Sequence, residues 1–241
     1  MAVANSIMQK PSNTQVTEYE ANGEIVRISP TMIRKYLVNG GGKVTDEEVT
    51  MFLSLCKFQH LNPFIREAYL IKYGDTQPAT MVVGKDVFMK RAKRQPEFDG
   101  MEAGIIVRNK ETKQTENREG TFWDKSVEDL AGGWARVYLK NFRVPVYSSV
   151  SIGEYVGRKK NGEVNAQWMG KPATMIRKVA LLQALREAFP EQNSGMYGQE
   201  EIKEAQGVNL DEEAVAVEAE AVEVVEEPKK EAADVAGALF D

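Results

Sequence analysis

The sequence predicts an α+β fold, in which an antiparallel β-meander packs with helices around one long central helix. Three features predict it: helical patterns come first, β-type runs fill the middle of the chain, and a long apolar helical stretch follows them. Because most of the β-type runs follow one another without an intervening helix, they favour a meander over a βαβ array. From residue 198 onward Ala, Val and Glu dominate, which predicts a disordered acidic C-terminal tail.

This pattern divides the chain into three parts. Residues 1–24 are polar and lack helical or strand periodicity, so we expect a mobile N-terminal arm. Residues 25–198 are expected to form one core, and residues 199–241 the acidic tail.

Two helical patterns open the core. Ser29 and Pro30 are typical of the start of a helix, which we expect to end before the glycine run 40–42, a flexible hinge. Thr45 and Glu48 then match a capping box, which predicts a second helix with an apolar face.

The middle of the chain predicts strands around one basic helix. Tyr69–Tyr73 and Thr80–Val83 flank turn residues and predict a hairpin. Gly84–Gln95 predicts a helix whose cations, Arg91 among them, point outward. Further strands are expected at Met101–Arg108, Trp134–Lys140 and Arg143–Ser151. The polar stretch Asn109–Glu128 is expected to be a loop.

Residues Lys171–Phe189 predict the central helix. Pro172 suits its first turn, and Pro190 prevents it from continuing. Apolar residues occupy nearly its whole circumference, so we expect the helix to be almost completely buried. It nevertheless carries three cations, Arg177, Lys178 and Arg186. A cation on a buried helix must be paired or must line a wet groove, so the helix alone leaves two alternatives, internal carboxylates or a polyanion.

The formal net charge of −5 is distributed unevenly along the chain. From Glu200 onward, 14 acidic and 3 basic residues give a net charge of −11, whereas the preceding 199 residues contain 22 acidic and 28 basic residues. A basic body favours a nucleic-acid partner, and an acidic tail would be repelled by that partner or regulate its binding. On charge alone, a solubilising tail on an ordinary enzyme is an equally good interpretation.

Common catalytic and metal-binding motifs are absent from the sequence. One cysteine, Cys56, excludes an internal disulfide and a cysteine-based zinc site, and His60 is the only histidine. The run Gly40–Lys43 is followed by Val44, where a phosphate loop needs Ser or Thr. We therefore expect no catalytic residues, no metal and no cofactor. Without a signal peptide or a long apolar run, the protein is expected to be cytoplasmic and free of membranes.

Basic residues alternate with aromatic ones in the second half of the core. Arg136, Tyr138 and Lys140 fall on one face of a predicted strand, and further cations surround Trp168. Such a set suits a single strand of nucleic acid, because cations follow phosphates and aromatic surfaces receive bases. For the two aromatic residues core packing is the alternative, which we favour more for Tyr138 than for Trp168.

An ordered series of stretches carries a resemblance to a known family. The stretches are Leu61-Asn62-Pro63-Phe64 with Glu67 and Tyr69, Val82-Val83-Gly84, Phe98-Asp99-Gly100-Met101, Arg136-Val137-Tyr138, Trp168, and Met175-Ile176-Arg177 through Gln183, Arg186 and Ala188-Phe189. In this order, from about Lys35 to Tyr197, they resemble the phage RecT/Red-beta (Bet) recombinases. The resemblance implies an ATP-independent protein that anneals single strands of DNA in homologous recombination and that is not an enzyme.

The resemblance also implies a DNA groove lined by basic residues of the strands and the central helix. Together with the basic and aromatic set, it predicts DNA-binding residues at Lys43, Arg66, Lys140, Lys159, Lys160, Trp168, Lys171, Arg177, Lys178 and Arg186. Lys178 lies where Red-beta proteins have a histidine, and Val179 where they have a lysine, so the central cations are partly rearranged.

The partners implied by the resemblance are single-stranded DNA, annealed duplex and further copies of the chain in a ring or helical filament, in the cytoplasm of a bacterial host. The family's C-terminal domain, which engages an exonuclease and the host single-strand-binding protein, has no clear counterpart here. Leu239-Phe240 could serve as a docking peptide in its place, or these two residues could have no role. Two other functions stay open: an adaptor whose basic body binds a protein partner, and, less favoured, a metal-dependent nuclease.

Overall fold

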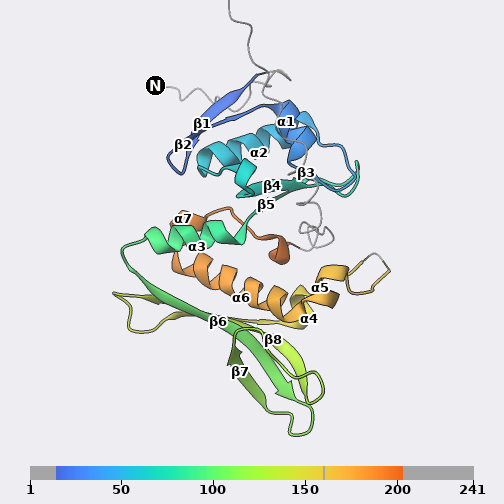
Figure 1. Ribbon diagram of the computed structural model, residues 1–241, viewed down its shortest axis with the longest axis vertical. Helices are drawn as coiled ribbons and strands as arrows, with labels where there is room; N and C mark the ends of the chain where they lie inside the picture. The colour runs from blue at the N-terminus through green and yellow to red at the C-terminus, as the bar shows by residue number, and fades with distance from the viewer. Residues whose placement is uncertain (1–14, 160, 203–241) are drawn as a thin grey trace, which may run out of the picture. The chain divides into compact units, whose positions relative to one another are not determined.

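The computed structural model describes residues 15–159 and 161–202 (Figure 1). All of them belong to the first of two compact units, residues 1–209, and the second unit, residues 210–241, lies outside the described residues. The fold is α+β, as predicted, and the strand pairs of the described residues are antiparallel except for the short parallel pair β3–β4. Most of the predicted arm and of the acidic tail lies outside the described residues.

A hairpin occupies the end of the expected arm, which corrects the prediction for residues 17–24. Strands β1 (Thr17–Ala21) and β2 (Glu24–Ile28) pair around Asn22 and Gly23, both with positive φ, as a tight two-residue turn requires. Alternate residues of the two strands are buried, although glutamates between them make the segment look polar in sequence. The hydroxyl of Tyr19 donates to the Leu61 carbonyl oxygen at 2.8 Å, which fastens the hairpin to the core.

The two predicted helices and the predicted hairpin follow, together with a short strand and a 3-10 turn that the sequence pattern does not predict. The elements are α1 (Pro30–Tyr36), β3 (Val38–Asn39), α2 (Asp46–Phe58), the 3-10 turn η2 (Pro63–Ile65), β4 (Ala68–Ile71) and β5 (Thr80–Val83). Strand β4 pairs with β3 on one side and with β5 on the other. The Thr45 and Glu48 capping box of α2 is confirmed, because each side chain accepts from the other residue's backbone N–H.

The glycine run 40–42 packs against the backbone instead of forming an open hinge. Gly42 N–H donates to the Lys72 carbonyl oxygen at 2.9 Å, and a Cβ on Gly40 would collide with that same oxygen. Only glycine permits so close an approach, and Gly40 also has φ +92°. The run thus joins β3 to the loop after β4, which corrects the flexible-hinge prediction.

A four-stranded antiparallel sheet forms the second half of the core. After α3 (Lys85–Arg94) come β6 (Phe98–Asn109), β7 (Thr115–Glu119), β8 (Glu128–Leu139) and β9 (Val146–Ser151), in the spatial order β7-β6-β8-β9. Strand β7 lies inside the expected loop 109–128, so that prediction was wrong. Its sequence TENRE has no apolar residue because it is an edge strand with mostly exposed side chains.

The central helix α6 (Pro172–Ala188) is confirmed and lies against one face of this sheet (Figure 1). A Cβ on Gly133 of β8 would lie 2.5 Å from the Ile176 carbonyl oxygen, so helix and strand touch through their backbones there. The remaining elements are α4 (Ile152–Tyr155), α5 (Ala166–Gly170), α7 (Pro190–Asn193) and the 3-10 turn η3 (Gln199–Glu201). Figure 1 shows α3 and α7 on the side of α6 away from the sheet. No helix within the described ranges is long and apolar enough to span a membrane.

Candidate nucleic-acid interface

Two of the three cations on α6 are paired with internal carboxylates. Lys178 Nζ lies 3.0 Å from Glu200 Oε1, and the Arg186 guanidinium binds both Glu201 oxygens at 2.9 and 2.6 Å. The same guanidinium lies 4.8 Å from the centre of the Tyr197 ring. Burial alone would lower the pKa of Arg186, but its bonds to Glu201 raise it above the ordinary value. The internal-carboxylate alternative therefore holds for these two residues.

Arg177 is held differently. Its Nε donates to the Ala103 carbonyl oxygen of β6 at 3.0 Å, and no carboxylate of the described residues forms an ion pair with it. A carbonyl oxygen is a neutral acceptor, so it orients the guanidinium without cancelling its charge. The side chain is half-buried, and the polyanion alternative therefore stays open for this residue.

Lys140 and Arg158 share this arrangement. Arg158 Nη1 donates to the Gly162 carbonyl oxygen at 2.9 Å, and Lys140 Nζ donates to the Pro96 carbonyl oxygen at 2.7 Å. Neither forms an ion pair with a described carboxylate. We call Lys140, Arg158 and Arg177 the carbonyl-bound cations.

The other predicted DNA-binding residues are spread over several elements. Lys43 and Arg66 are exposed beside the three-stranded sheet, and Lys171 is exposed between α5 and α6. Lys159, in the loop before α5, forms a largely exposed ion pair with Glu163 at 3.4 Å. The structure thus gathers residues around α5 and α6 but places Lys43, Arg66 and Lys140 elsewhere. Three predicted residues lie outside the described ranges, Lys160, Leu239 and Phe240.

The two aromatic predictions are reversed in the structure. Trp168 is only 1% exposed, so its ring packs in the core and is not available to stack on a base, which corrects its assignment to the DNA site. Tyr138, for which we favoured core packing, lies on the sheet face away from α6 and donates to Glu102 Oε2 at 3.0 Å. The sequence could not separate them because Trp168 sits in a five-residue helix whose buried side is set by α6.

The outer face of the sheet, opposite α6, carries an arginine between two aromatic rings. The Arg136 guanidinium carbon lies 5.2 Å from the Trp134 ring centre and 5.5 Å from that of Tyr147, close enough for cation–π contact. Gly104 leaves room for the indole, since a Cβ there would lie 2.8 Å from Trp134 Nε1. Sequence analysis did not select Trp134 and Tyr147. Alternation from Arg136 points to Trp134, but Tyr147 requires the register between β8 and β9.

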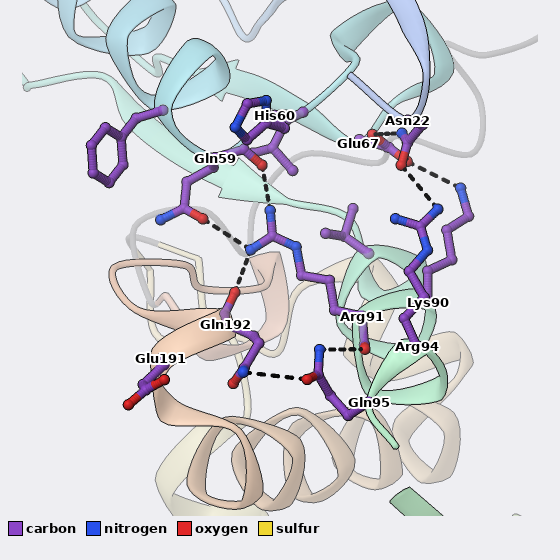
Figure 2. A pocket seen from close by; sticks show the side chains of 13 residues that line it. Asn22, Gln59, His60, Glu67, Lys90, Arg91, Arg94, Gln95, Glu191 and Gln192 are labelled. Atoms are coloured by element: carbon purple, nitrogen blue, oxygen red, sulfur yellow. Dashed lines mark hydrogen bonds and ion pairs between the residues drawn. The ribbon is translucent and has the colours of Figure 1, made fainter. Parts of the chain in front are cut away.

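A cleft of about 430 Å³ opens between the β1–β2 turn, the end of α2, and α3 and α7 (Figure 2). Arg91 reaches across it and donates to the carbonyl oxygens of Gln59 and Gln192 and to Gln59 Oε1, the last at 2.9 Å. Burial lowers the pKa of Arg91 below its ordinary value. The expectation that Arg91 points outward was therefore wrong, because it joins three elements in the half-buried cleft.

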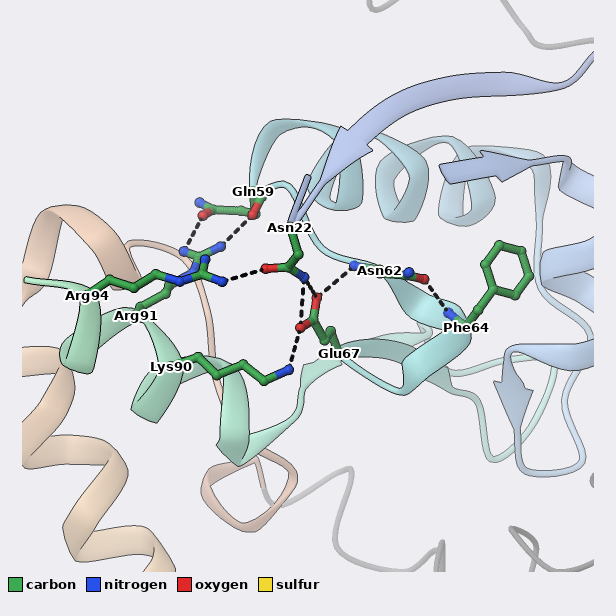
Figure 3. Close-up of polar contacts among 8 residues, drawn as sticks. All are labelled: Asn22, Gln59, Asn62, Phe64, Glu67, Lys90, Arg91 and Arg94. Atoms are coloured by element: carbon green, nitrogen blue, oxygen red, sulfur yellow. Dashed lines mark hydrogen bonds and ion pairs between the residues drawn. The ribbon is translucent and has the colours of Figure 1, made fainter. Parts of the chain in front are cut away.

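A buried carboxylate organises the other side of the cleft (Figure 3). Glu67 accepts from Asn22 Nδ2 at 2.9 and 3.0 Å, from Asn62 N–H at 2.9 Å and from Lys90 Nζ at 3.0 Å. Arg94 donates to Asn22 Oδ1 at 3.3 Å. Because Asn22 and Lys90 are distant from Glu67 in sequence, no local pattern predicts these contacts. Glu67 is paired with Lys90, and the cluster joins the β1–β2 turn and the segment after α2 to helix α3.

No group of three or more His, Cys, Asp or Glu side chains in the described part of the chain is placed to hold a metal ion. In comparisons with known proteins, the model of the RecT family matches residues 23–216, about four-fifths of the chain. The comparison with curated proteins found no match to this chain.

Proposed function

The chain belongs to the RecT family, and on that premise we propose that it coats single-stranded DNA as an oligomer and pairs complementary strands without ATP. RecT proteins are annealing proteins of DNA recombination and not conventional enzymes. What the proposal adds for this chain is direct binding of a single strand, assembly into an oligomer and independence from a nucleotide cofactor.

The carbonyl-bound cations are the observation that carries the proposal. Each of them is fixed in direction by a neutral oxygen, at 2.7 to 3.0 Å, and none is neutralised by a described carboxylate. A phosphate oxygen is the natural partner for a guanidinium or ammonium whose charge is still uncancelled. Arg177 is the strongest of the three, since it is half-buried on a helix most of whose residues are buried, where an uncompensated charge has a cost.

Cations that are oriented but not neutralised have the chemistry that annealing without ATP needs. Cations that bind the sugar-phosphate chain lower the repulsion between two strands and raise the local concentration of one strand near the other. Base pairing then supplies the free energy, about 1.4 kcal/mol for each stacked step, so no nucleotide hydrolysis is needed. One protomer covers few nucleotides, which favours neighbouring copies that share a strand.

The test is the affinity of Arg177→Gln for a fluorescent oligonucleotide, measured by anisotropy over a range of salt concentrations. We expect binding to weaken by about tenfold at low salt, because a charge-assisted hydrogen bond to phosphate is lost. The slope of log affinity against log salt should fall by about 0.7, the value for one phosphate contact on a single strand.

Arg27→Gln is the matched control, because Arg27 is an exposed arginine on β2 with a 71% accessible side chain. It should leave affinity nearly unchanged. Equal affinity of the folded Arg177→Gln variant and the unmodified protein would contradict the proposed role. Loss of folded protein in Arg177→Gln would instead make the arginine a structural partner of Ala103.

A further inference from the structure

The chain returns along α6 after α7, between that helix and the three-stranded sheet (Figure 1). Val83 N–H, at the end of β5, donates to the Tyr197 carbonyl oxygen at 3.0 Å. Gly198 packs so closely on Leu182 of α6 that a Cβ would collide with the leucine side chain. We call the segment Tyr197–Ile202 the clasp.

The clasp brings two carboxylates onto two cations of α6. Glu200 binds Lys178 and Glu201 binds Arg186 through both oxygens, and the two glutamate side chains are only 11% and 4% exposed. The geometry is fixed locally, since Gly198 N–H donates to Glu201 Oε2 at 3.0 Å. These glutamates are also the first two acidic residues of the acidic tail, residues 199–241.

The clasp neutralises Lys178 and Arg186 of α6 but leaves Arg177 without a carboxylate partner among the described residues. Lys178 is the next residue and Arg186 lies further along the same helix, yet only these two are neutralised. A bidentate carboxylate and a phosphate offer arginine the same pair of charged acceptor oxygens. A site that accepts Glu201 in this way therefore has the chemistry to accept a phosphodiester group.

We propose that the clasp is an internal competitor of nucleic acid, whose carboxylates occupy phosphate positions at Lys178 and Arg186 until single-stranded DNA displaces them. This inference rests on the proposed function and adds its regulation. The cationic side chains remain 33% and 24% exposed, so phosphates can reach them, and a polyanion that makes many contacts at once can displace the two carboxylates. The measured affinity for DNA is then the intrinsic affinity reduced by the fraction of molecules in which the clasp is open.

The experiment compares three full-length proteins: the unmodified chain, Glu200→Gln/Glu201→Gln, and the control Glu187→Gln/Glu111→Gln. Both variants lose two negative charges, but Glu187 and Glu111 are exposed and lie outside the clasp. Affinity for a fluorescent oligothymidine is measured by anisotropy at one salt concentration, and the fold of each protein is checked by circular dichroism. The clasp variant should bind about three- to tenfold more tightly than the control, as release of a mostly closed clasp predicts.

Equal affinity of the clasp variant and the control, with the unmodified chain still binding, would overturn the competitor role and leave the proposed function standing. Absence of binding by all three proteins would contradict the proposed function and the competitor role together. The three outcomes are therefore distinguishable.

Hydrogen exchange on the unmodified chain provides a second test that does not depend on the folding of a variant. The amides of Glu201 and Ile202 donate to the Gly198 and Gln199 carbonyl oxygens, which protects them from exchange while the clasp is closed. Saturating oligothymidine should accelerate their exchange. Unchanged or slower exchange would show that DNA binds without moving the clasp and would overturn the proposal.

Discussion

The partner of each cation decides whether its charge is available to a polyanion. A carboxylate neutralises the cation, whereas a carbonyl oxygen only orients it. The sequence alone identifies the three cations on α6 and shows that each needs an acceptor. It could not assign an acceptor to each, because Ala103, Glu200 and Glu201 are brought there only by the fold. The expectations for Trp168 and Tyr138 are reversed for the same reason, because the side that each ring faces depends on packing between elements.

Glu48 makes a prediction about pH at this scale. Its burial would raise its pKa, but hydrogen bonds from Lys72 Nζ and from the backbone N–H groups of Thr45 and Ala79 lower it below the ordinary value. A lowered pKa in the folded state stabilises the fold above the unfolded-state value of about 4.3. That contribution disappears as pH falls through the folded-state pKa. The pKa values of Asp124, Glu128 and Glu163 are lowered too and act in the same direction.

The free energy of unfolding, from urea titrations between pH 3 and 7, should therefore fall on the acid side for the unmodified protein. Glu48→Gln should flatten this acid limb, whereas Glu187→Gln on the exposed side of α6 should not. An acid limb that is equally steep in Glu48→Gln would show that this carboxylate does not contribute.

At the scale of whole elements, segments with strong local sequence signals have the predicted structure, whereas segments with weak signals differ from the prediction. The prolines around α6 and the capping box of α2 define their helices without help from the rest of the chain. In β1, glutamates alternate with Tyr19 and Ala21, and β7 contains no apolar residue, so neither strand has a strong apolar pattern. They form because a neighbouring strand pairs with them, and the sequence of the segment alone does not show which strand will be its neighbour.

The contact of α6 with β8 yields a prediction for one glycine. Gly133→Ala places a Cβ 2.5 Å from the Ile176 carbonyl oxygen, so the helix must shift away from the sheet. We expect a loss of about 2 kcal/mol in the free energy of unfolding, typical of an overpacked core. Gly170→Ala, where a Cβ meets nothing within 4 Å, is the control. Equal stability of the two variants in urea titrations would contradict the close backbone contact.

At the scale of the whole molecule, the division of charge noted in the sequence acquires a physical meaning. The family resemblance is confirmed by the match over residues 23–216, and it gives the basic body a partner class. The structure adds that some cations of this body are neutralised internally while others are only oriented. The adaptor and nuclease interpretations find no comparable observation in the described residues.

Strand annealing tests the central claim most directly. Two complementary oligonucleotides, one with a fluorophore and one with a quencher, are mixed with the protein in low salt without any nucleotide cofactor, and quenching is followed in time. We expect pairing to be at least about tenfold faster than without protein, because bound strands meet at a raised local concentration, and the acceleration should vanish at high salt. A pairing rate equal to that of the protein-free mixture, with folded protein in excess, would contradict the account.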